Sequence, residues 1–134
     1  MAARFLLTLV ASAALPALAH HSFAMFDQSK QVTLVGTVKE FQWTNPHAFI
    51  HVEVPAAGGT EVWDIELNSP NNLKRQGWKP TSLKAGDKVT LVANPLRDLS
   101  HKGGLFIAVT LPDGTVLGDA TRVGNTGPIN VPMP

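Results

Sequence analysis

The feature that most restricts the fold of this chain is a segment of alternating residue types that ends at Val54. The positions on one side are apolar and those on the other mostly polar: Ala48, Ile50, Val52 and Val54 alternate with His47, Phe49, His51 and Glu53. In a β-strand successive side chains point to opposite faces, so the pattern predicts a strand with one core face and one histidine-bearing face. Asn45-Pro46 before it indicates a turn, because proline fixes its own φ and keeps the preceding residue out of the helical region.

A second alternating segment, residues 61–67, predicts the strand that pairs with the first. Residues 55–59 are small or turn-forming, which indicates a five-residue hairpin loop. One register aligns core with core, and a shift by one residue would mix core with surface. Its opposing pairs are Val54–Glu61, Val52–Trp63, Ile50–Ile65, His51–Asp64 and Phe49–Glu66. Trp63, Ile65 and Leu67 are then expected to point inward, and Val62, Asp64 and Glu66 outward.

Three further strands and one short helix are predicted elsewhere. A long strand over 32–43 changes its apolar face after Gly36, which indicates a bulge or a sharp bend. Ser69 suits a helix N-cap, Pro70 the first helical position and Gly77 the left-handed end, which predicts a helix of about two turns. Two more strands are expected over residues 88–93, ended by Asn94-Pro95, and over 105–111, with a short hairpin following at 112–117.

This order of three strands, a helix and two strands predicts an all-β fold with little helix. It is the element order of the five-stranded oligonucleotide/oligosaccharide-binding (OB) barrel, whose first strand is long and bent. An open sandwich is the alternative architecture. The barrel is assigned to residues 32–120, preceded by an arm over 20–31 and followed by a flexible tail over 121–134. The apolar residues of the arm suggest that it packs on the barrel.

Residues 1–19 have the layout of a secretory signal peptide. Arg4 precedes an apolar run over 5–11, and Ala17-Leu18-Ala19 forms the small-residue cleavage site. The run is shorter than the roughly 20 residues of a membrane span. We therefore expect a periplasmic or secreted protein that begins at His20 and does not span the membrane once the signal is cleaved. An uncleaved anchor is the alternative.

Charge and cysteine content exclude several classes of function. The chain has 11 Lys and Arg against 10 Asp and Glu, so removal of Arg4 leaves a neutral protein. A neutral exported protein lacks the basic field that nucleic-acid binding requires. The chain has no cysteine, which excludes disulfides, thiolate zinc sites and cysteine catalysis.

His20 and His21 are the candidate metal ligands with the most specific chemistry. If cleavage follows Ala19, a free α-amine lies beside two imidazoles, and this nitrogen-rich set suits copper, Cu(II). His47 or His101 would complete the site, because an extended arm reaches up to ~40 Å. His47 and His51 are about 13 Å apart on one strand, too far for a shared metal. The alternatives are an incidental His-His start and a His47 that only bonds backbone at the turn.

The outward face of the strand pair is the second candidate site, a binding surface. Its residues are Phe49, His51, Glu53, Asp64 and Glu66. The Asp64 carboxylate is expected to orient the His51 imidazole, which suits binding of a small molecule or an exported or membrane protein partner. No serine lies beside the pair, and hydrolysis by Glu53 and Glu66 is the weaker alternative, so no enzyme is predicted. A plain surface ion pair and a purely structural role stay open.

Several motifs together resemble a known family. They are His20-His21-Ser22-Phe23-Ala24-Met25-Phe26-Asp27, Gly36-Thr37-Val38, Phe41-Gln42-Trp43-Thr44-Asn45-Pro46-His47, Trp63 with Glu66, Ser69-Pro70-Asn71, Gly77-Trp78, Gly86-Asp87 and Asn94-Pro95-Leu96-Arg97-Asp98. They resemble the bacterial exported proteins of domain of unknown function 6152 (DUF6152). The chain departs from that pattern at Leu99, in the loop that holds His101. The resemblance implies export and a small β-barrel, with no established activity and no catalytic residues.

Overall fold

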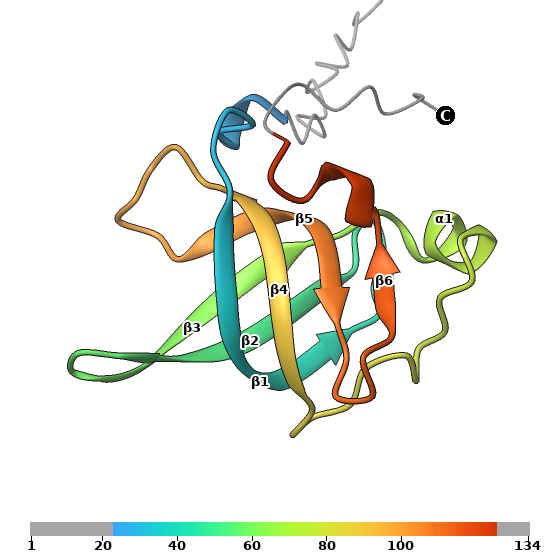
Figure 1. Ribbon diagram of the computed structural model, residues 1–134. Coiled ribbons are helices and arrows are strands. Elements are labelled where there is room, and N and C mark those ends of the chain that lie inside the picture. The colour runs from blue at the N-terminus through green and yellow to red at the C-terminus, as the bar shows by residue number, and fades with distance from the viewer. Residues whose placement is uncertain (1–22, 126–134) are drawn as a thin grey trace, which may run out of the picture.

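The computed structural model describes residues 23–125 as a closed β-barrel with little helix. The elements are η1 (Phe23–Met25), β1 (Val32–Gln42), β2 (Phe49–Ala56), β3 (Gly59–Glu66), α1 (Pro70–Arg75), β4 (Lys88–Pro95), β5 (Gly103–Thr110), β6 (Val116–Gly118) and η2 (Ala120–Arg122). The sheet order is β3-β2-β1-β4-β5-β6, and a parallel pairing of β3 with β5 closes the first five strands into a barrel (Figure 1). The predicted OB-type barrel, with its helix between β3 and β4, is confirmed.

The pairing of β2 with β3 follows the predicted register. His51 faces Asp64, Val52 faces Trp63 and Phe49 faces Glu66. Ile50, Val52 and Ile65 are buried in the core, as the alternation requires. The predicted five-residue loop is wrong, because the strands continue to an Ala56–Gly59 pair and leave a tight turn between them.

The long first strand bends as predicted, and Figure 1 shows β1 curving around the barrel. A register shift lies between Val38 and Glu40, a few residues after Gly36. At Gly36 itself a Cβ would lie 2.3 Å from the Glu53 carbonyl oxygen, so the glycine permits close approach of β1 to β2. Bulge and glycine together produce the bend.

Helix α1 has the predicted ends. The Ser69 hydroxyl accepts a hydrogen bond from the Asn72 N–H, Pro70 is the first helical residue, and Gly77 has φ of 89°. Leu73 turns inward from this helix, and Trp78 follows it, so both join the barrel core. The helix thus covers one end of the barrel.

Strand β4 was predicted to end at residue 93, before Asn94-Pro95, but it continues through both residues. Pro95 pairs with Gly104 as the last residue of the strand, where a missing N–H costs little. Its carbonyl accepts a hydrogen bond from the Asp27 N–H, at 2.8 Å. The side-chain amide of Asn94 donates to the Lys30 carbonyl, at 2.7 Å. The arm therefore bonds the Pro95 carbonyl and the Asn94 side chain, and these contacts stabilise the last two residues of the strand.

The described part of the arm, from Phe23 onward, packs on the barrel. Phe26 is 4% exposed and forms a bridge with Leu96 of the β4–β5 connection. Gln31 bonds the carbonyls of Arg122 and Asn125, so the arm also holds the start of the segment predicted to be a flexible tail. The predicted signal peptide, His20 and His21 lie outside the described residues. Within residues 23–125, no helix has the length and apolarity to cross a membrane.

Candidate functional site

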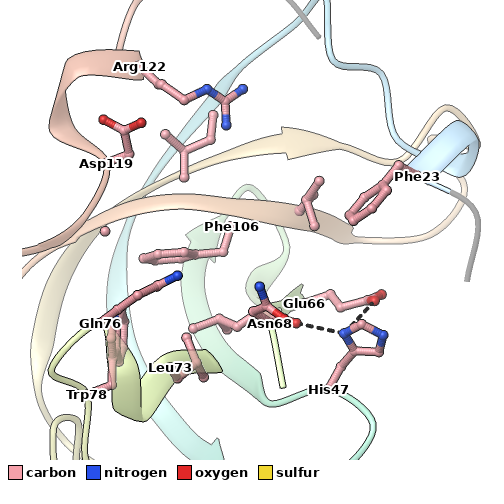
Figure 2. A pocket seen from close by; sticks show the side chains of 14 residues that line it. Phe23, His47, Glu66, Asn68, Leu73, Gln76, Trp78, Phe106, Asp119 and Arg122 are labelled. Carbon is pink, nitrogen blue, oxygen red and sulfur yellow. Dashed lines mark hydrogen bonds and ion pairs between the residues drawn. The ribbon is translucent and has the colours of Figure 1, made fainter. Parts of the chain in front are cut away.

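One end of the barrel holds a cavity of about 440 Å³, bounded by α1, the corner before β2, β5 and the β6–η2 segment (Figure 2). Its apolar wall includes Phe23, Leu73, Trp78, Leu105, Phe106 and Ile107. Its polar groups are His47, Glu66, Asn68, Gln76, Asp119 and Arg122. The cavity therefore combines an aromatic interior with a few charged groups, as small-molecule sites do.

His47 is fixed at the mouth of this cavity by the turn before β2. The Asn45–Pro46 peptide is cis, and the Thr44 hydroxyl donates to the His47 carbonyl at 3.0 Å. The His47 Nδ1 lies 3.0 Å from the Leu67 carbonyl oxygen. A carbonyl only accepts, so Nδ1 carries the hydrogen in this contact.

Glu66 lies beside His47, with Oε1 at 3.6 Å from Nδ1. The sequence placed Glu66 on the outward face of β3, but the residue is only 8% exposed. The reason is barrel closure, because Glu66 pairs with Leu105 of β5 at the end of the parallel seam. Its carboxylate therefore faces a partly enclosed space rather than bulk solvent.

Aromatic rings form the interior of the cavity. Trp78 and Phe106 meet edge to face with ring centroids 5.4 Å apart, and the ring centroid of Phe41 lies 5.9 Å from that of Trp78. Edge-to-face pairs stabilise ring positions beyond simple burial. Sequence reasoning missed Trp78 and Phe106 as site residues, since each reads as an ordinary core residue. The available signal was a tryptophan directly after the helix-ending Gly77.

Arg122 brings a buried, unmatched donor to the same cavity. Its Nη2 is buried, and no described residue supplies it with a hydrogen-bond acceptor. The nearby Asp119 carboxylate accepts hydrogen bonds from the backbone and hydroxyl of Thr121 and so caps η2. Sequence reasoning placed Arg122 in a flexible tail and did not predict this group.

The predicted binding surface borders a second hollow of about 340 Å³. Phe49, Asp64 and Glu66 line it together with His101 and Lys102 of the β4–β5 loop. His51 lies beside it, with its ring stacked on Phe49 at 6.2 Å and 13°. The structure thus brings His101 to the surface of β2 and β3, which the sequence did not predict.

His51 and Glu53 do not line that hollow. His51 uses both ring nitrogens, with Nδ1 2.5 Å from Asp64 Oδ1 and Nε2 2.9 Å from Gln42 Oε1. The pairing with Asp64 follows from the predicted register, whereas Gln42 of β1 was not foreseen. Glu53 is half-buried opposite Val62. His51 is therefore a bridge between three strands, without a ring nitrogen to spare for a metal.

The candidate metal ligands are divided between the two hollows. His47 lines the larger one, whereas His101 is 75% exposed in the loop, with Nε2 3.8 Å from Asp98 Oδ2. A hydrogen bond from the Ser100 hydroxyl holds the pKa of Asp98 below its usual value. From Phe23 to Asn125, no three His, Cys, Asp or Glu residues are grouped to hold a metal ion. His20 and His21 belong to the part of the chain that is not described.

The sequence model described as "Family of unknown function (DUF6152)" matches residues 7–106. The chain belongs to this family. The solved structure of Rim1, a mitochondrial single-stranded DNA-binding protein from S. cerevisiae, is similar with a TM-score of 0.46 and 15% identity. The match covers 62% of this chain and 93% of Rim1, and it is too weak to support an argument. No curated protein matches the chain.

Proposed function

We propose that this DUF6152 protein is an exported accessory protein that binds copper, with Cu(II) held between the processed N-terminus and His47. One observation carries the proposal. Phe23 of the arm lines the same cavity as His47 and Glu66 (Figure 2). His20 precedes Phe23 by three positions. Three extended residues span about 10 Å, so the new N-terminus can reach the cavity mouth.

The geometry of His47 suits a metal ligand. A histidine that binds a metal through one nitrogen commonly donates the other N–H to a backbone carbonyl or carboxylate. His47 has this arrangement, with Nδ1 on the Leu67 carbonyl and Glu66 close by. Cu(II) favours imidazole and amine nitrogens, which His20, His21 and His47 would supply together. His101 lines the other hollow, so His47 is the favoured partner.

Titration with Cu(II) tests the proposal on chains that begin at His20. His47→Gln is expected to weaken binding at least about tenfold, roughly 1.4 kcal/mol, and to change the copper EPR spectrum. His101→Gln is the matched control and should change neither. A chain with one extra residue before His20 should also bind more weakly, because it moves the α-amine. Unchanged affinity and spectrum for His47→Gln would overturn the shared site.

Export is tested separately, by expressing the full chain in a bacterial host and sequencing the N-terminus of the purified protein. The expected start is His20, in the fraction outside the cytoplasm, because Ala17-Leu18-Ala19 has the form of a cleavage site. A chain that keeps Met1, or that stays in the cytoplasm, would contradict the proposal.

The surface of β2 and β3 is a second candidate function, binding of a small molecule or protein partner without metal. The stacked Phe49 and His51 beside the second hollow favour it, since half-buried aromatic rings are common anchors in interfaces. Phe49→Ala should remove a specific partner in cross-linking from intact cells. Val35→Ala on β1, where the side chain is 65% exposed, is the control. If both variants cross-link to the same partners, the surface of β2 and β3 is not a binding site.

A further inference from the structure

We propose that the hollow of about 340 Å³ beside β3 and the β4–β5 loop binds a linear diamine, whose two ammonium groups pair with Asp64 and Glu66 and whose carbon chain lies along Phe49. The inference does not depend on copper. It rests on the second candidate function, the surface of β2 and β3, and names a ligand class for it. Its basis is a buried carboxylate that accepts no hydrogen bond, a second carboxylate on the same strand face, and an apolar wall beside them.

Glu66 supplies the main argument for a cationic ligand. Its side chain is 10% exposed, and among residues 23–125 neither carboxylate oxygen accepts a hydrogen bond. Of the basic groups described, only His47 comes within ion-pair distance, with Nδ1 3.6 Å from Oε1, and this nitrogen donates to the Leu67 carbonyl instead. The Glu66 oxygens keep accessible surface, whereas the Nη2 of Arg122 is sealed. A largely buried carboxylate without donors is costly, and an ammonium group supplies them.

Asp64 places a second carboxylate two residues earlier on the same face of β3. Its Oδ1 contacts Nδ1 of His51, and its side chain is 60% exposed beside the hollow. Residues two apart on a strand are about 6.6 Å apart. The nitrogens of an extended 1,4-diaminobutane are separated by a comparable distance, ~6 Å from ordinary bond lengths. Two carboxylates at this spacing therefore favour a diamine over a monoamine.

The basic residues of the loop that lines the hollow are paired with other acids. Lys102 Nζ lies 3.6 Å from Glu61 Oε1 and 5.6 Å from the ring centroid of Trp63. His101 Nε2 lies 3.8 Å from Asp98 Oδ2. Neither residue pairs with the two carboxylates proposed to bind the ligand. The hollow therefore keeps negative charge that a cationic ligand can balance.

The apolar wall of the hollow suits the carbon chain between two ammonium groups. Phe49 of β2 faces Glu66 across the strand pair, and its ring is stacked beside that of His51 with centroids 6.2 Å apart. Met25 and Val62 also line the hollow and are 47% and 38% exposed, so they have surface left to cover a ligand. An ammonium group near an aromatic face gains further attraction. A volume of about 340 Å³ is at the low end for small-molecule sites, as a short diamine requires.

Calorimetry on the metal-free chain that begins at His20 tests the proposal, at about 0.15 M salt to screen exposed charges. The probe is 1,4-diaminobutane, and the matched ligand is 1-aminobutane, which lacks the second charge. The diamine should bind at least about tenfold more tightly than the monoamine. Glu66→Gln should weaken diamine binding at least about tenfold, and Asp64→Asn should remove the preference for the diamine. Glu53→Gln is the matched control, since Glu53 lies on the same sheet face and does not line the hollow, and it should bind as the parent chain does.

Equal binding of the two amines, or no binding of either at about 1 mM, would overturn the proposal. So would a Glu53→Gln variant that loses as much affinity as Glu66→Gln. Thermal unfolding of each variant distinguishes lost binding from lost folding, and Asp64→Asn at an exposed side chain tests the preference even if Glu66→Gln unfolds. His47→Gln, the copper variant, should keep its diamine affinity within about twofold, so the two proposals fail separately. Cross-linking in cells reports protein partners, whereas these titrations use purified protein, so either result can fail alone.

Discussion

Gly36 is the residue on which the shape of the barrel depends most directly. A Cβ there would lie 2.3 Å from the Glu53 carbonyl oxygen and 2.9 Å from Val52 Cγ1. The backbone of β2 cannot move away without breaking its pairing with β3. Gly36→Ala should therefore destabilise the protein by about 3 kcal/mol, measured by urea unfolding.

The matched control is Gly58→Ala in the β2–β3 turn, where a Cβ meets nothing within 4 Å. Its free energy of unfolding should stay within about 0.5 kcal/mol of the parent chain. Equal stability of the two variants would show that β1 does not approach β2 as closely as described.

The stability of the junction between the arm and the barrel is expected to depend on pH through the carboxyl group of Asp27. The Ser29 hydroxyl, above all, lowers the pKa of Asp27 from its ordinary value of 3.8, with Lys30 contributing. A carboxyl whose pKa is lower in the folded state stabilises that state above the ordinary pKa, and the effect is lost as the pH falls through the folded value.

Asp27→Asn should therefore lower the Tm at pH values well above 3.8, and the difference from the parent chain should shrink below that pH. Thermal unfolding followed by circular dichroism over an acidic pH series measures it. A difference that persists to the most acidic point would mean that the charge of Asp27 is not what holds the arm.

At the scale of single residues, the sequence predicts which side chains face each other on neighbouring strands. It does not predict the contacts that form when β3 pairs with β5 and closes the barrel. The contact of His51 with Asp64 follows from register alone, since alternation fixes which side chains face each other. The burial of Glu66 does not, because it depends on β5, a strand that begins at residue 103. The residue pattern of one strand does not show which distant strand will cover it.

Among the elements, the parallel seam between β3 and β5 closes the barrel with few pairs. It has three: Asp64–Gly103, Ile65–Gly104 and Glu66–Leu105. At Gly104 a Cβ would lie 2.8 Å from the Asn94 carbonyl oxygen, whereas at Gly103 it would lie 2.8 Å from the side-chain Cδ1 of Leu96 and 3.2 Å from the Asp64 carbonyl oxygen. Gly104→Ala should cost about 2 to 3 kcal/mol and Gly103→Ala about 1 kcal/mol or less.

Hydrogen exchange is the sharper readout of this pair. The Asp64 N–H, which donates to the Lys102 carbonyl beside the seam, should exchange faster in Gly104→Ala than in Gly103→Ala. The reverse order would show that the seam accommodates a side chain at Gly104 more easily than the backbone contact implies.

Element types were predictable and some element ends were not. Alternation identified β2 and β3, and the residues Ser69, Pro70 and Gly77 placed both ends of α1. The predicted end of β4 was wrong because Asn94 and Pro95 disfavour a strand locally, while hydrogen bonds between the arm and these residues stabilise the strand there. Tertiary contacts of this kind are invisible in a local pattern.

At the scale of the whole molecule, the cavity could not be predicted from any single segment of the sequence. Its wall comes from the arm, the corner before β2, the end of β3, α1, β5 and η2, which the barrel brings to one end (Figure 2). The sequence predicted His47 as a metal ligand and Glu66 as part of a separate binding surface. Closure of the barrel places these two side chains side by side.

We propose that the processed N-terminus and His47 share one copper ion, and a crystal structure of the Cu(II)-loaded chain starting at His20 tests this most directly. Anomalous scattering at the copper edge should give one peak, about 2 Å from His47 Nε2 and from the nitrogens of His20. A peak that lies at the N-terminus without His47, or beside His101, would contradict the account.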